Sequence, residues 1–375
     1  ASEFHALMER HGWIKVKTSK GREDWRRPGK SDGISATWNY LEDSFYVFSS
    51  NAAPFKDNHR YTIKQVQQLL EPENVPLKDR PITEKCYLTD MGNARRFAIR
   101  FSDQFRYTSG WGWMMWSGKK WAREDGDNIM QAARHTVKAI FDEARDAQNP
   151  DDVKAAGKWA MTSQSRGRIE AMVKLAETER EFTARVEDFD QDSYSLNVEN
   201  GIIDLRTGAI RPHDYGALFA KITGTGYRDD EECPKWTAFI SRIMGGSDSL
   251  IKFLQRAVGY SLTGSTQEQC FFLLHGTGAN GKSVFLETMR AVLKDYAATA
   301  EFSTFLAKQN ENVRNDIAAL AGARFVASSE SGADKRLSET IIKALTGGDT
   351  ISARLLFKEY FEFKPQFKVW MATNH

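Results

Sequence analysis

The segment that decides the fold of the carboxyl-terminal part is Gly276-Thr277-Gly278-Ala279-Asn280-Gly281-Lys282-Ser283. It fits the pattern G-x-x-x-x-G-K-S in full. Glycines permit a tight turn in which successive backbone N–H groups face one anion, and a following helix adds the positive end of its dipole. In such loops the lysine neutralises phosphate charge and the serine hydroxyl contacts Mg²⁺. All eight residues are therefore predicted to bind ATP and Mg²⁺.

The sequence around this loop predicts alternating strands and helices. An apolar strand, Cys270–Leu274, precedes the loop, and a helix is expected from Lys282 to about Asp295. Two more apolar strands follow, Phe325–Ser328 and Lys368–Ala372. Such alternation is typical of a parallel sheet covered by helices.

Polar residues at the ends of the later strands are candidates for the chemistry of this site. Glu330 follows one strand and is predicted to coordinate Mg²⁺ and to activate water. Glu339 is a second candidate, although a solvated helix face explains it equally well. Asn374 ends the last strand, where it is either a polar sensor of the γ-phosphate or an ordinary turn residue.

Three segments are expected along the chain. Residues 1–80 are predicted to form a small β-rich module closed by a helix that Thr62 caps, and residues 81–235 a mainly helical α+β domain. That domain should contain helices at Ile129–Arg145 and Arg168–Arg185, and a hairpin at Asn200-Gly201. Residues 236–375 complete a multidomain α/β chain with the parallel-sheet ATP-binding domain, which is expected to be truncated at its carboxyl-terminal end.

The composition is that of a globular protein, with 41% hydrophobic and 27% charged residues and a formal net charge of +2. No run of eighteen apolar residues predicts a membrane span, and the host-cell cytoplasm is the expected location. The three cysteines are far apart in the sequence, which favours a reducing compartment over a disulfide framework. The start, Ala1-Ser2-Glu3-Phe4, has no leader pattern and is interpreted as a cloning remnant or the cut edge of a longer chain.

The amino-terminal segment combines basic and aromatic residues. Seven cations lie between Lys15 and Lys30, and Arg26, Arg27 and Lys30 are predicted to contact DNA. The neighbouring aromatics could stack on single-stranded bases, and these are Trp25, Trp38, Tyr46 and Phe48. The alternative is that they form the core of the small module and that the charges are only a solvated face.

Several motifs in one order resemble a known family. They are the 276–283 loop, Gly322–Glu330, Leu345–Asp349 with Ala353-Arg354, and Ala372–His375. This series resembles the superfamily 3 helicase core of phage and plasmid primase-helicases, a family that includes the poxvirus primase-helicase. Upstream, Leu88–Ala94, Leu196–Gly201 and Gly259–Gly264 resemble the helical domain that precedes that core.

The resemblance implies an AAA+-like, P-loop ATPase of a phage, plasmid or mobile element that assembles as a hexameric ring and moves along single-stranded or forked DNA. It implies a covalently linked or separate primase as a partner. Carried over by position, Lys282 and Ser283 contact nucleotide and Mg²⁺, Glu330 is the acidic residue of the second ATPase motif, and Asn374 is the sensor. Many members have two adjacent acidic residues where this chain has Glu330 between serines. The arginine finger is expected beyond His375, so weak ATPase activity is expected of this chain alone.

A DNA-gripping hairpin is predicted between the turn Gly347-Gly348-Asp349 and the last strand. Its candidate DNA contacts are Arg354, Phe357 and Lys358, because a translocating grip needs a phosphate-seeking charge beside an aromatic ring. The alternative is an ordinary hairpin in which Lys358 pairs with a neighbouring glutamate.

Three functions remain open from the sequence. The chain is predicted to be the ATP-dependent helicase part of a primase-helicase. It could also be another P-loop DNA motor, or a non-catalytic fragment for DNA loading or ring assembly.

Overall fold

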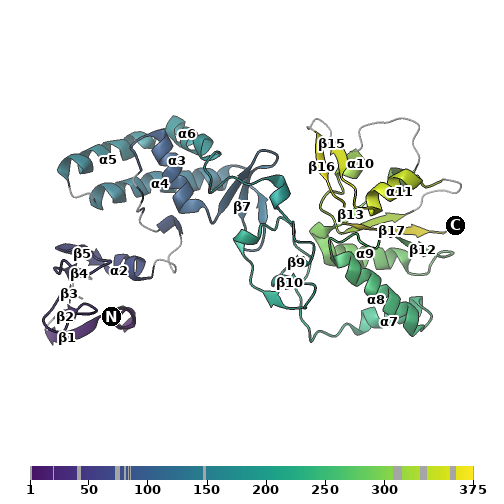
Figure 1. Cartoon of the computed structure of the whole chain (residues 1–375), viewed down its shortest axis with the longest axis horizontal. Helices are drawn as coiled ribbons and strands as arrows, with labels where there is room; N and C mark the ends of the chain where they lie inside the picture. Colours follow the sequence, from purple (N-terminus) through teal and green to yellow (C-terminus); the bar gives the residue numbers. More distant parts are fainter. Residues whose placement is uncertain are drawn as a thin grey trace. The chain divides into compact units, whose positions relative to one another are not determined.

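The computed structural model describes residues 2–19, 21–39, 44–71, 77–79, 82, 84, 86–146, 149–306, 315–329, 336–354 and 360–374. The backbone forms two compact units (Figure 1), the first made of Ala1–Arg106 and Asp125–Thr183 and the second of Tyr107–Glu124 and Ala184–His375. The predicted domain boundaries at residues 80 and 235 stay predictions. Within the described residues, no helix is both long enough and apolar enough to cross a membrane.

The first unit begins with a five-stranded antiparallel meander and two helices. The helices are α1 (Ser2–Arg10) and α2 (Ile63–Leu70), and the strands are β1 (Ile14–Ser19), β2 (Arg22–Arg26), β3 (Ala36–Asn39), β4 (Ser44–Val47) and β5 (His59–Thr62). Thr62 caps α2 in a reciprocal capping box with Gln65, as predicted. Phe4, in the segment interpreted as a cloning remnant, is buried against Trp38 and Phe45, so α1 belongs to the core of this module.

Four longer helices make up the rest of the first unit, after the short 3-10 helix η2 (Leu77–Asp79). They are α3 (Asp90–Phe101), α4 (Asp127–Asp146), α5 (Pro150–Ser163) and α6 (Arg166–Ala176). The helix predicted at 129–145 is therefore confirmed. The helix predicted at 168–185 is too long, because the chain leaves α6 through tight turns that bring the buried Phe182 ring to 5.1 Å from that of Phe97. The contact with Phe97 outweighs local helix propensity.

The second unit starts with two small sheets. One contains β6 (Phe105–Thr108), β7 (Gly112–Trp116) and β8 (Trp121–Arg123), and the other β9 (Ser195–Val198), β10 (Gly201–Asp204) and β11 (Ile210–Arg211). The predicted hairpin is confirmed, because the antiparallel strands β9 and β10 are joined by Glu199-Asn200, and Gly201 begins β10 opposite Val198. The 3-10 helices η3 (Val186–Asp188) and η4 (Tyr215–Ala217) lie in the same region. Helices α7 (Pro234–Ile243) and α8 (Asp248–Leu262) then lead into the four-stranded sheet of this unit.

That sheet is parallel and has the order β12-β17-β14-β13. Its strands are β12 (Phe272–His275), β13 (Ala297–Thr299), β14 (Phe325–Ser329) and β17 (Lys368–Thr373). Its helices are α9 (Lys282–Leu293), α10 (Asn315–Ala318) and α11 (Glu339–Thr346), with η5 (Lys294–Tyr296) and η6 (Phe302–Phe305) between. A separate antiparallel pair, β15 (Ile351–Arg354) and β16 (Tyr360–Phe363), confirms a hairpin before the last strand. The coarse fold class, a multidomain α/β chain with a β-rich start and a parallel sheet at its end, is thus confirmed.

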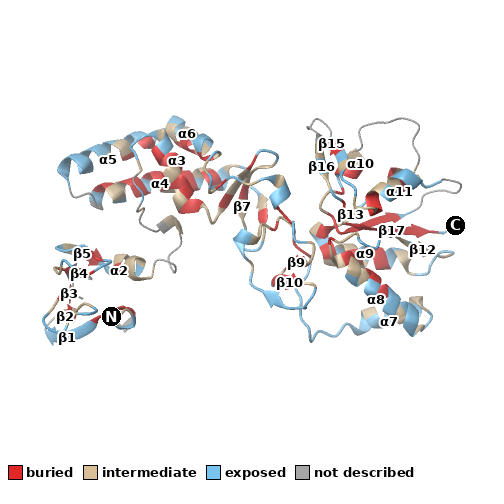
Figure 2. Cartoon of the chain, in the orientation of Figure 1, coloured by how far each residue is buried: buried red, intermediate tan, exposed pale blue. Residues whose placement is uncertain are grey.

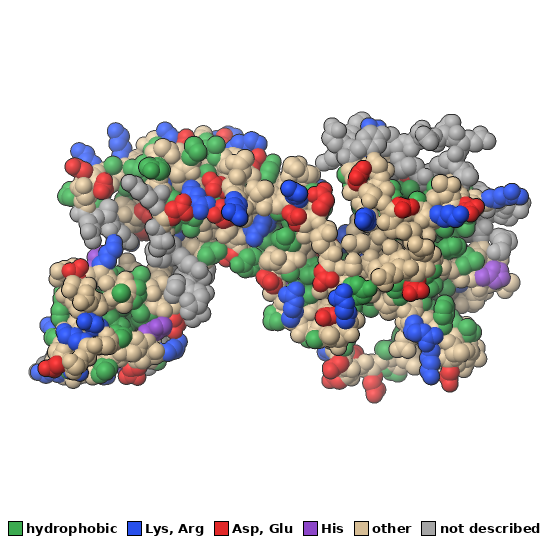
Figure 3. Space-filling view, in the orientation of Figure 1, with side chains coloured by type: hydrophobic (Ala, Val, Ile, Leu, Met, Phe, Trp, Pro, Cys, Tyr) green, Lys and Arg blue, Asp and Glu red, His purple; other side chains and the backbone are tan. Residues whose placement is uncertain are grey.

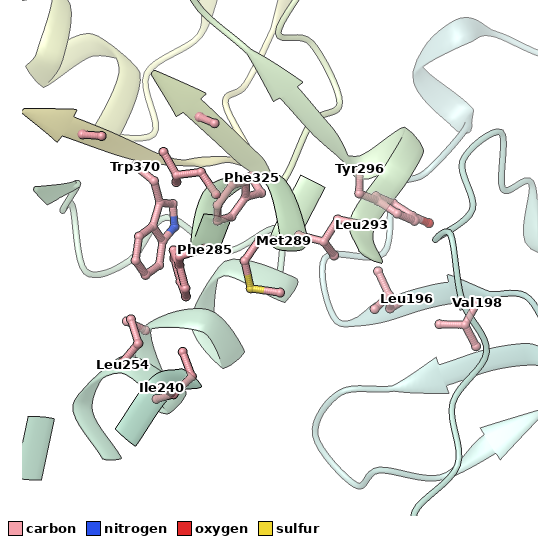
Figure 4. Close-up of a cluster of buried hydrophobic side chains, with 14 of the residues drawn as sticks. Leu196, Val198, Ile240, Leu254, Phe285, Met289, Leu293, Tyr296, Phe325 and Trp370 are labelled. Carbon is pink, nitrogen blue, oxygen red and sulfur yellow. The ribbon is translucent and has the colours of Figure 1, made fainter. Parts of the chain in front are cut away.

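The central strand β17 is buried along its whole length (Figure 2). Its Trp370 is 1% exposed, and its indole lies 4.3 Å from the ring of Phe272 and 5.3 Å from that of Phe285, measured between centroids. The indole N–H donates to the Ser261 hydroxyl of α8 at 3.0 Å. Figure 4 shows Trp370 beside Phe285 and Phe325 in the cluster that joins α7, α8 and α9 to the sheet. One side chain therefore ties the edge strand, the central strand and two helices together.

Arg324, immediately before β14, is fully buried and carries its charge into the protein interior. Its guanidinium donates to the carbonyls of Leu262 at 2.8 Å, Asp192 at 2.9 Å and Ser195 at 2.8 Å. These carbonyls belong to the end of α8 and to the start of the β9 hairpin. Arg324 therefore satisfies buried acceptors from two neighbouring segments while β14 leads into the sheet.

We expect Arg324→Met to lower the stability of the second unit by roughly 3 kcal/mol, because three buried carbonyls lose their donor. Chemical denaturation followed by tryptophan fluorescence measures this change. The control is Arg228→Met, which removes a guanidinium whose side chain is 69% exposed and paired only with Glu231; it should cost at most about 0.5 kcal/mol. Equal losses in the two variants would show that Arg324 has no special structural role.

Candidate active site at the sheet edge

The parallel register places the carboxyl-terminal ends of three strands at one edge of the sheet. His275, the last residue of β12, pairs with Thr373 of β17. Ala372 of β17 pairs in turn with Ser329, the last residue of β14. Side chains and loops that follow these residues are therefore neighbours, although they come from sequence positions up to about a hundred residues apart.

The glycine-rich segment 276–281 leaves β12 at this edge and turns directly into α9. At two of its glycines, a side chain would meet neighbouring side chains. A Cβ at Gly276 would lie 1.8 Å from the side-chain nitrogen of Asn280. A Cβ at Gly281, whose φ is +85°, would lie 2.8 Å from Ile243 and 3.1 Å from Phe239 of α7. The loop is thus confined between its own polar side chain and a preceding helix.

The ammonium group of Lys282 is bonded to three acceptors at this edge. Its Nζ donates to the carbonyl of Gly276 at 2.6 Å, to Asn280 Oδ1 at 3.0 Å and to Asn374 Oδ1 at 2.9 Å. Two of these acceptors are in the loop, and the third follows β17. The structure therefore brings together the lysine and the asparagine that the sequence predicted as site residues, ninety-two positions apart.

The amino terminus of α9 provides a second source of positive potential. Lys282 is the first residue of this twelve-residue helix, and its N-cap, Gly281, has no side chain to cap the first N–H groups. Those groups need an external acceptor, and the helix dipole favours an anionic one. Ser283 is exposed in this first turn, where its hydroxyl is accessible to a ligand.

Two cavities lie beside the loop. The first, of about 550 Å³, is lined by Ser283, Glu287 and Arg290 of α9 and by Ser328 and Ser329 at the end of β14, among other residues. The second, of about 400 Å³, includes Asn280 and Lys282. Its other walls are mainly apolar, and they include Phe253, Leu273 and Phe285. The loop therefore borders one cavity of mixed lining, through Ser283 at the start of α9, and a second cavity that is more apolar.

The remaining predicted site residues are only partly described. Glu330 follows Ser329 directly but lies outside the described residues, as do Phe357 and Lys358. Arg354 is the last residue of β15, opposite Tyr360 of β16. The roles of these residues stay predictions.

The predicted DNA contacts of the amino-terminal module bind backbone carbonyls of their own loop. Arg26 donates to the carbonyls of Gly33 at 2.9 Å and Ser31 at 3.1 Å. Arg27 donates to the carbonyl of Pro28, and Lys30 to that of Ile34. These bonds organise the 27–34 turn, and a contact with DNA by the three residues stays a prediction.

The sequence did not predict that α7 packs against the glycine-rich loop. Phe239 and Ile243 lie against the loop, and Trp236 stacks on Phe285 of α9 with their ring centroids 5.9 Å apart. Their spacing in α7 indicated only an apolar helix face. No local signal could tell that this face meets a glycine turn about forty residues later.

Two family models match the chain. Residues 94–245 match the model described as D5 N terminal like, and residues 274–375 match a family of unknown function, DUF5906. The predicted family resemblance is confirmed at this level: the chain carries a D5 N terminal-like region followed by a DUF5906 region. The second region begins two residues before the glycine-rich loop and spans the strands of the candidate site.

Two viral proteins resemble about half of the chain. The chain is 30% identical over 191 residues to "Putative helicase L207/L206" of Acanthamoeba polyphaga mimivirus, a match that covers 49% of this chain and 20% of that protein. It is 24% identical over 193 residues to "Putative helicase 022R" of Frog virus 3 (isolate Goorha), covering 50% and 18%. The chain thus spans about a fifth of the length of each of these relatives.

Solved structures show only a distant likeness. The chain resembles "The A form apo structure of NrS-1 C terminal region-CTR" with a TM-score of 0.36 and 9% identity, covering 42% of this chain and 38% of that one. "The apo structure of NrS-1 C terminal region (305-718)" matches with a TM-score of 0.31 and 11% identity, covering 39% and 34%.

We expect Lys282→Ala to weaken ATP binding by about 30-fold or more, because a charge-assisted phosphate contact contributes roughly 2 kcal/mol. Isothermal titration calorimetry with ATP and Mg²⁺ measures the affinity. Lys294→Ala, which removes a lysine at the far end of α9, serves as the control and should bind ATP normally. Unchanged affinity in a folded Lys282→Ala variant would show that the nucleotide site is elsewhere.

Proposed function

We propose that this chain is the ATP-binding motor part of a replication helicase from a virus, phage, plasmid or related mobile element. The observation that carries the proposal is the convergence of Lys282, the glycine-rich loop and Asn374 at the carboxyl edge of a parallel sheet. The viral relatives with helicase names support the same role.

The loop has the features that a nucleoside triphosphate requires. Backbone N–H groups at the start of α9 and the Lys282 ammonium would hold the β- and γ-phosphates. The Ser283 hydroxyl would contact Mg²⁺, and Glu330, which follows the end of β14, would complete that coordination and activate the attacking water. The residues present fit the cofactor, because the edge concentrates positive potential and the described side chains closest to Lys282 are neutral acceptors.

The contacts of Lys282 suggest how a nucleotide could change the site. Its ammonium is bonded to two loop oxygens and to Asn374. Phosphate oxygens would replace these neutral acceptors. Because phosphate oxygens are charged, they bind an ammonium group more strongly. Asn374 would then be released to contact the γ-phosphate or the attacking water, which is the behaviour expected of a polar sensor.

The proposed function also includes movement along DNA. The hairpin β15–β16 precedes β17, the strand that leads to Asn374. A change of position at Asn374 on nucleotide binding could therefore be passed to the hairpin along β17. We propose that Phe357 and Lys358, which lie between β15 and β16 in the sequence, grip single-stranded DNA, and that the working form is a ring of identical subunits. An AAA+-like, superfamily 3 motor coupled to a primase is the class that this arrangement suits.

The proposal as a whole is tested by DNA-dependent ATP hydrolysis and by unwinding of a forked duplex. Both should occur in the complete protein, and both should be lost together in Lys282→Ala. ATP binding without any response to DNA would support a nucleotide switch in place of a motor.

We expect Glu330→Gln to bind ATP and Mg²⁺ nearly normally but to hydrolyse ATP at least about 100-fold more slowly, because the variant keeps shape and loses the general base. Phosphate release and calorimetry give the two quantities. Glu339→Gln is the control, because Glu339 is paired with Lys343 on α11 and should leave hydrolysis unchanged. Loss of activity in the Glu339 variant alone would move the catalytic role to that residue.

We expect Lys358→Ala in the complete protein to weaken single-stranded DNA binding and unwinding, and to reduce the slope of log affinity against log salt by about one. ATP affinity should be unchanged. Lys174→Ala, an exposed lysine paired with Glu177 on α6, is the control. An unaltered affinity and salt slope would exclude the hairpin as the DNA grip.

A further inference from the structure

The amino-terminal sheet has one covered face and one exposed face. Strand register places Glu23, Trp38, Phe45 and Tyr61 in one row across β2–β5, and all four side chains are buried. The next row, one residue along each strand, contains Asp24, Thr37, Tyr46 and Arg60. Because successive residues of a strand point to opposite faces, this second row lies on the other side of the sheet.

Two aromatic rings lie on the exposed face. Tyr46 is 36% exposed, and Phe48, two residues later, is partly buried. Their ring centroids are 6.5 Å apart and their planes are inclined by 36°. Trp25 and Trp38, the other aromatics considered for stacking, are 0% and 1% exposed and belong to the core. The four aromatics of the sequence pattern are therefore divided between the two faces, and only Tyr46 and Phe48 remain accessible to a ligand.

Cations surround the two rings. Register places four of them on the same face, one from each of β1 and β5 and two from β2, and they are Lys17, Arg22, Arg26 and Arg60. Asp24 is the one carboxylate in those strand positions, and it pairs with Arg22 at 3.1 Å. The four cations outnumber Asp24 and Asp32, of which Asp32 lies 3.9 Å from Arg26, so positive charge is in excess among these described residues. Figure 3 shows Lys and Arg side chains, together with some Asp and Glu side chains, on the visible surface of the strands labelled β1–β5 in Figure 1.

We propose that this face, defined by Tyr46, Phe48, Lys17, Arg22 and Arg60, binds single-stranded DNA. Exposed aromatic rings offer stacking to unpaired bases of any sequence, whereas the bases of a duplex are stacked on one another and are not accessible. Cations on both sides of the rings complement the phosphates that connect the stacked bases. A ring pair beside a net positive charge thus fits an unpaired strand better than it fits a duplex or an acidic protein surface. The choice of DNA over RNA rests on the proposed replication function; the surface itself does not depend on it.

The proposal adds new residues to the three that the sequence predicted to bind DNA in this module, and those three stay predictions. Arg27 and Lys30 donate to carbonyls of the 27–34 turn, and Arg26 does so as well, although it also borders the face. Tyr46 and Arg60 belong to strands whose positions are fixed by the buried row behind them. Stacking on such a rigid surface loses little side-chain entropy, because the rings are already held by the sheet.

Photochemical cross-linking locates the contact directly. The whole chain, without nucleotide, is irradiated with an oligothymidylate that carries 5-iododeoxyuridine, and the modified peptides are identified by mass spectrometry. We expect adducts on Tyr46 or Phe48. Adducts confined to other segments, the 351–363 hairpin included, would overturn the proposal. The experiment needs no ATP, so the Lys282→Ala variant should give the same cross-linked peptides as the original chain. A failure of the proposed ATPase site would therefore not change this result.

Binding affinity provides the second measurement. In fluorescence anisotropy with a labelled oligothymidylate, we expect Tyr46→Leu to bind about 5-fold or more weakly, because one stacked base is lost. Tyr46→Phe keeps the ring and should bind like the original chain. Tyr227→Leu, at a tyrosine of nearly the same exposure (37%) in the second unit, is the matched control. Thermal unfolding checks that each variant is folded.

The remaining outcomes decide the nature of the ligand. Equal loss in Tyr46→Leu and Tyr227→Leu, or loss in Tyr46→Phe as large as in Tyr46→Leu, would contradict a stacking role. Equal affinity for duplex DNA, or preference for oligouridylate over oligothymidylate, would overturn the assignment to single-stranded DNA. A steep salt dependence that becomes shallower in Arg60→Gln would support the phosphate contacts.

Discussion

The alignment of three parallel strands is the constraint on which the candidate site depends. Each of β12, β17 and β14 ends within one residue of its neighbour, so the glycine-rich loop, Asn374 and Ser329 all lie at the same edge. Trp370 stabilises this alignment, because its indole contacts rings from β12, β14 and α9 and donates a hydrogen bond to α8. A shift of one residue in β17 would turn Trp370 out of the core and move Asn374 away from Lys282.

Electrostatics then determine what this edge can bind. The uncapped start of α9 and the Lys282 ammonium both present positive potential to the same small volume, and the nearby acceptors in the described chain are neutral amide and carbonyl oxygens. A polyanionic ligand therefore gains more there than the existing contacts provide. The two cavities beside the loop extend the surface that the proposed nucleotide and its metal ion would occupy.

The sequence was most informative where local rules are strict. The loop between an apolar strand and a helix, the Thr62 cap and the Asn200-Gly201 hairpin each depend on a few adjacent residues, and their positions could be predicted closely. Periodicity was less reliable at Arg168–Arg185, because a tertiary contact of Phe182 ends the helix early. The division of the amino-terminal aromatics between core and surface could not be predicted. It depends on strand register, which a basic and aromatic composition does not reveal. The burial of Arg324 and the packing of α7 on the loop are likewise long-range effects with no local signal.

The central claim is that Lys282 exchanges its present acceptors for the phosphates of a nucleotide. A crystal structure of the chain with a non-hydrolysable ATP analogue and Mg²⁺ tests this most directly. The account predicts phosphate density against the N–H groups of residues 278–283, with Lys282 Nζ bonded to phosphate oxygens and no longer to Gly276 and Asn374. A nucleotide bound elsewhere, or bound here with the Lys282 contacts unchanged, would contradict it.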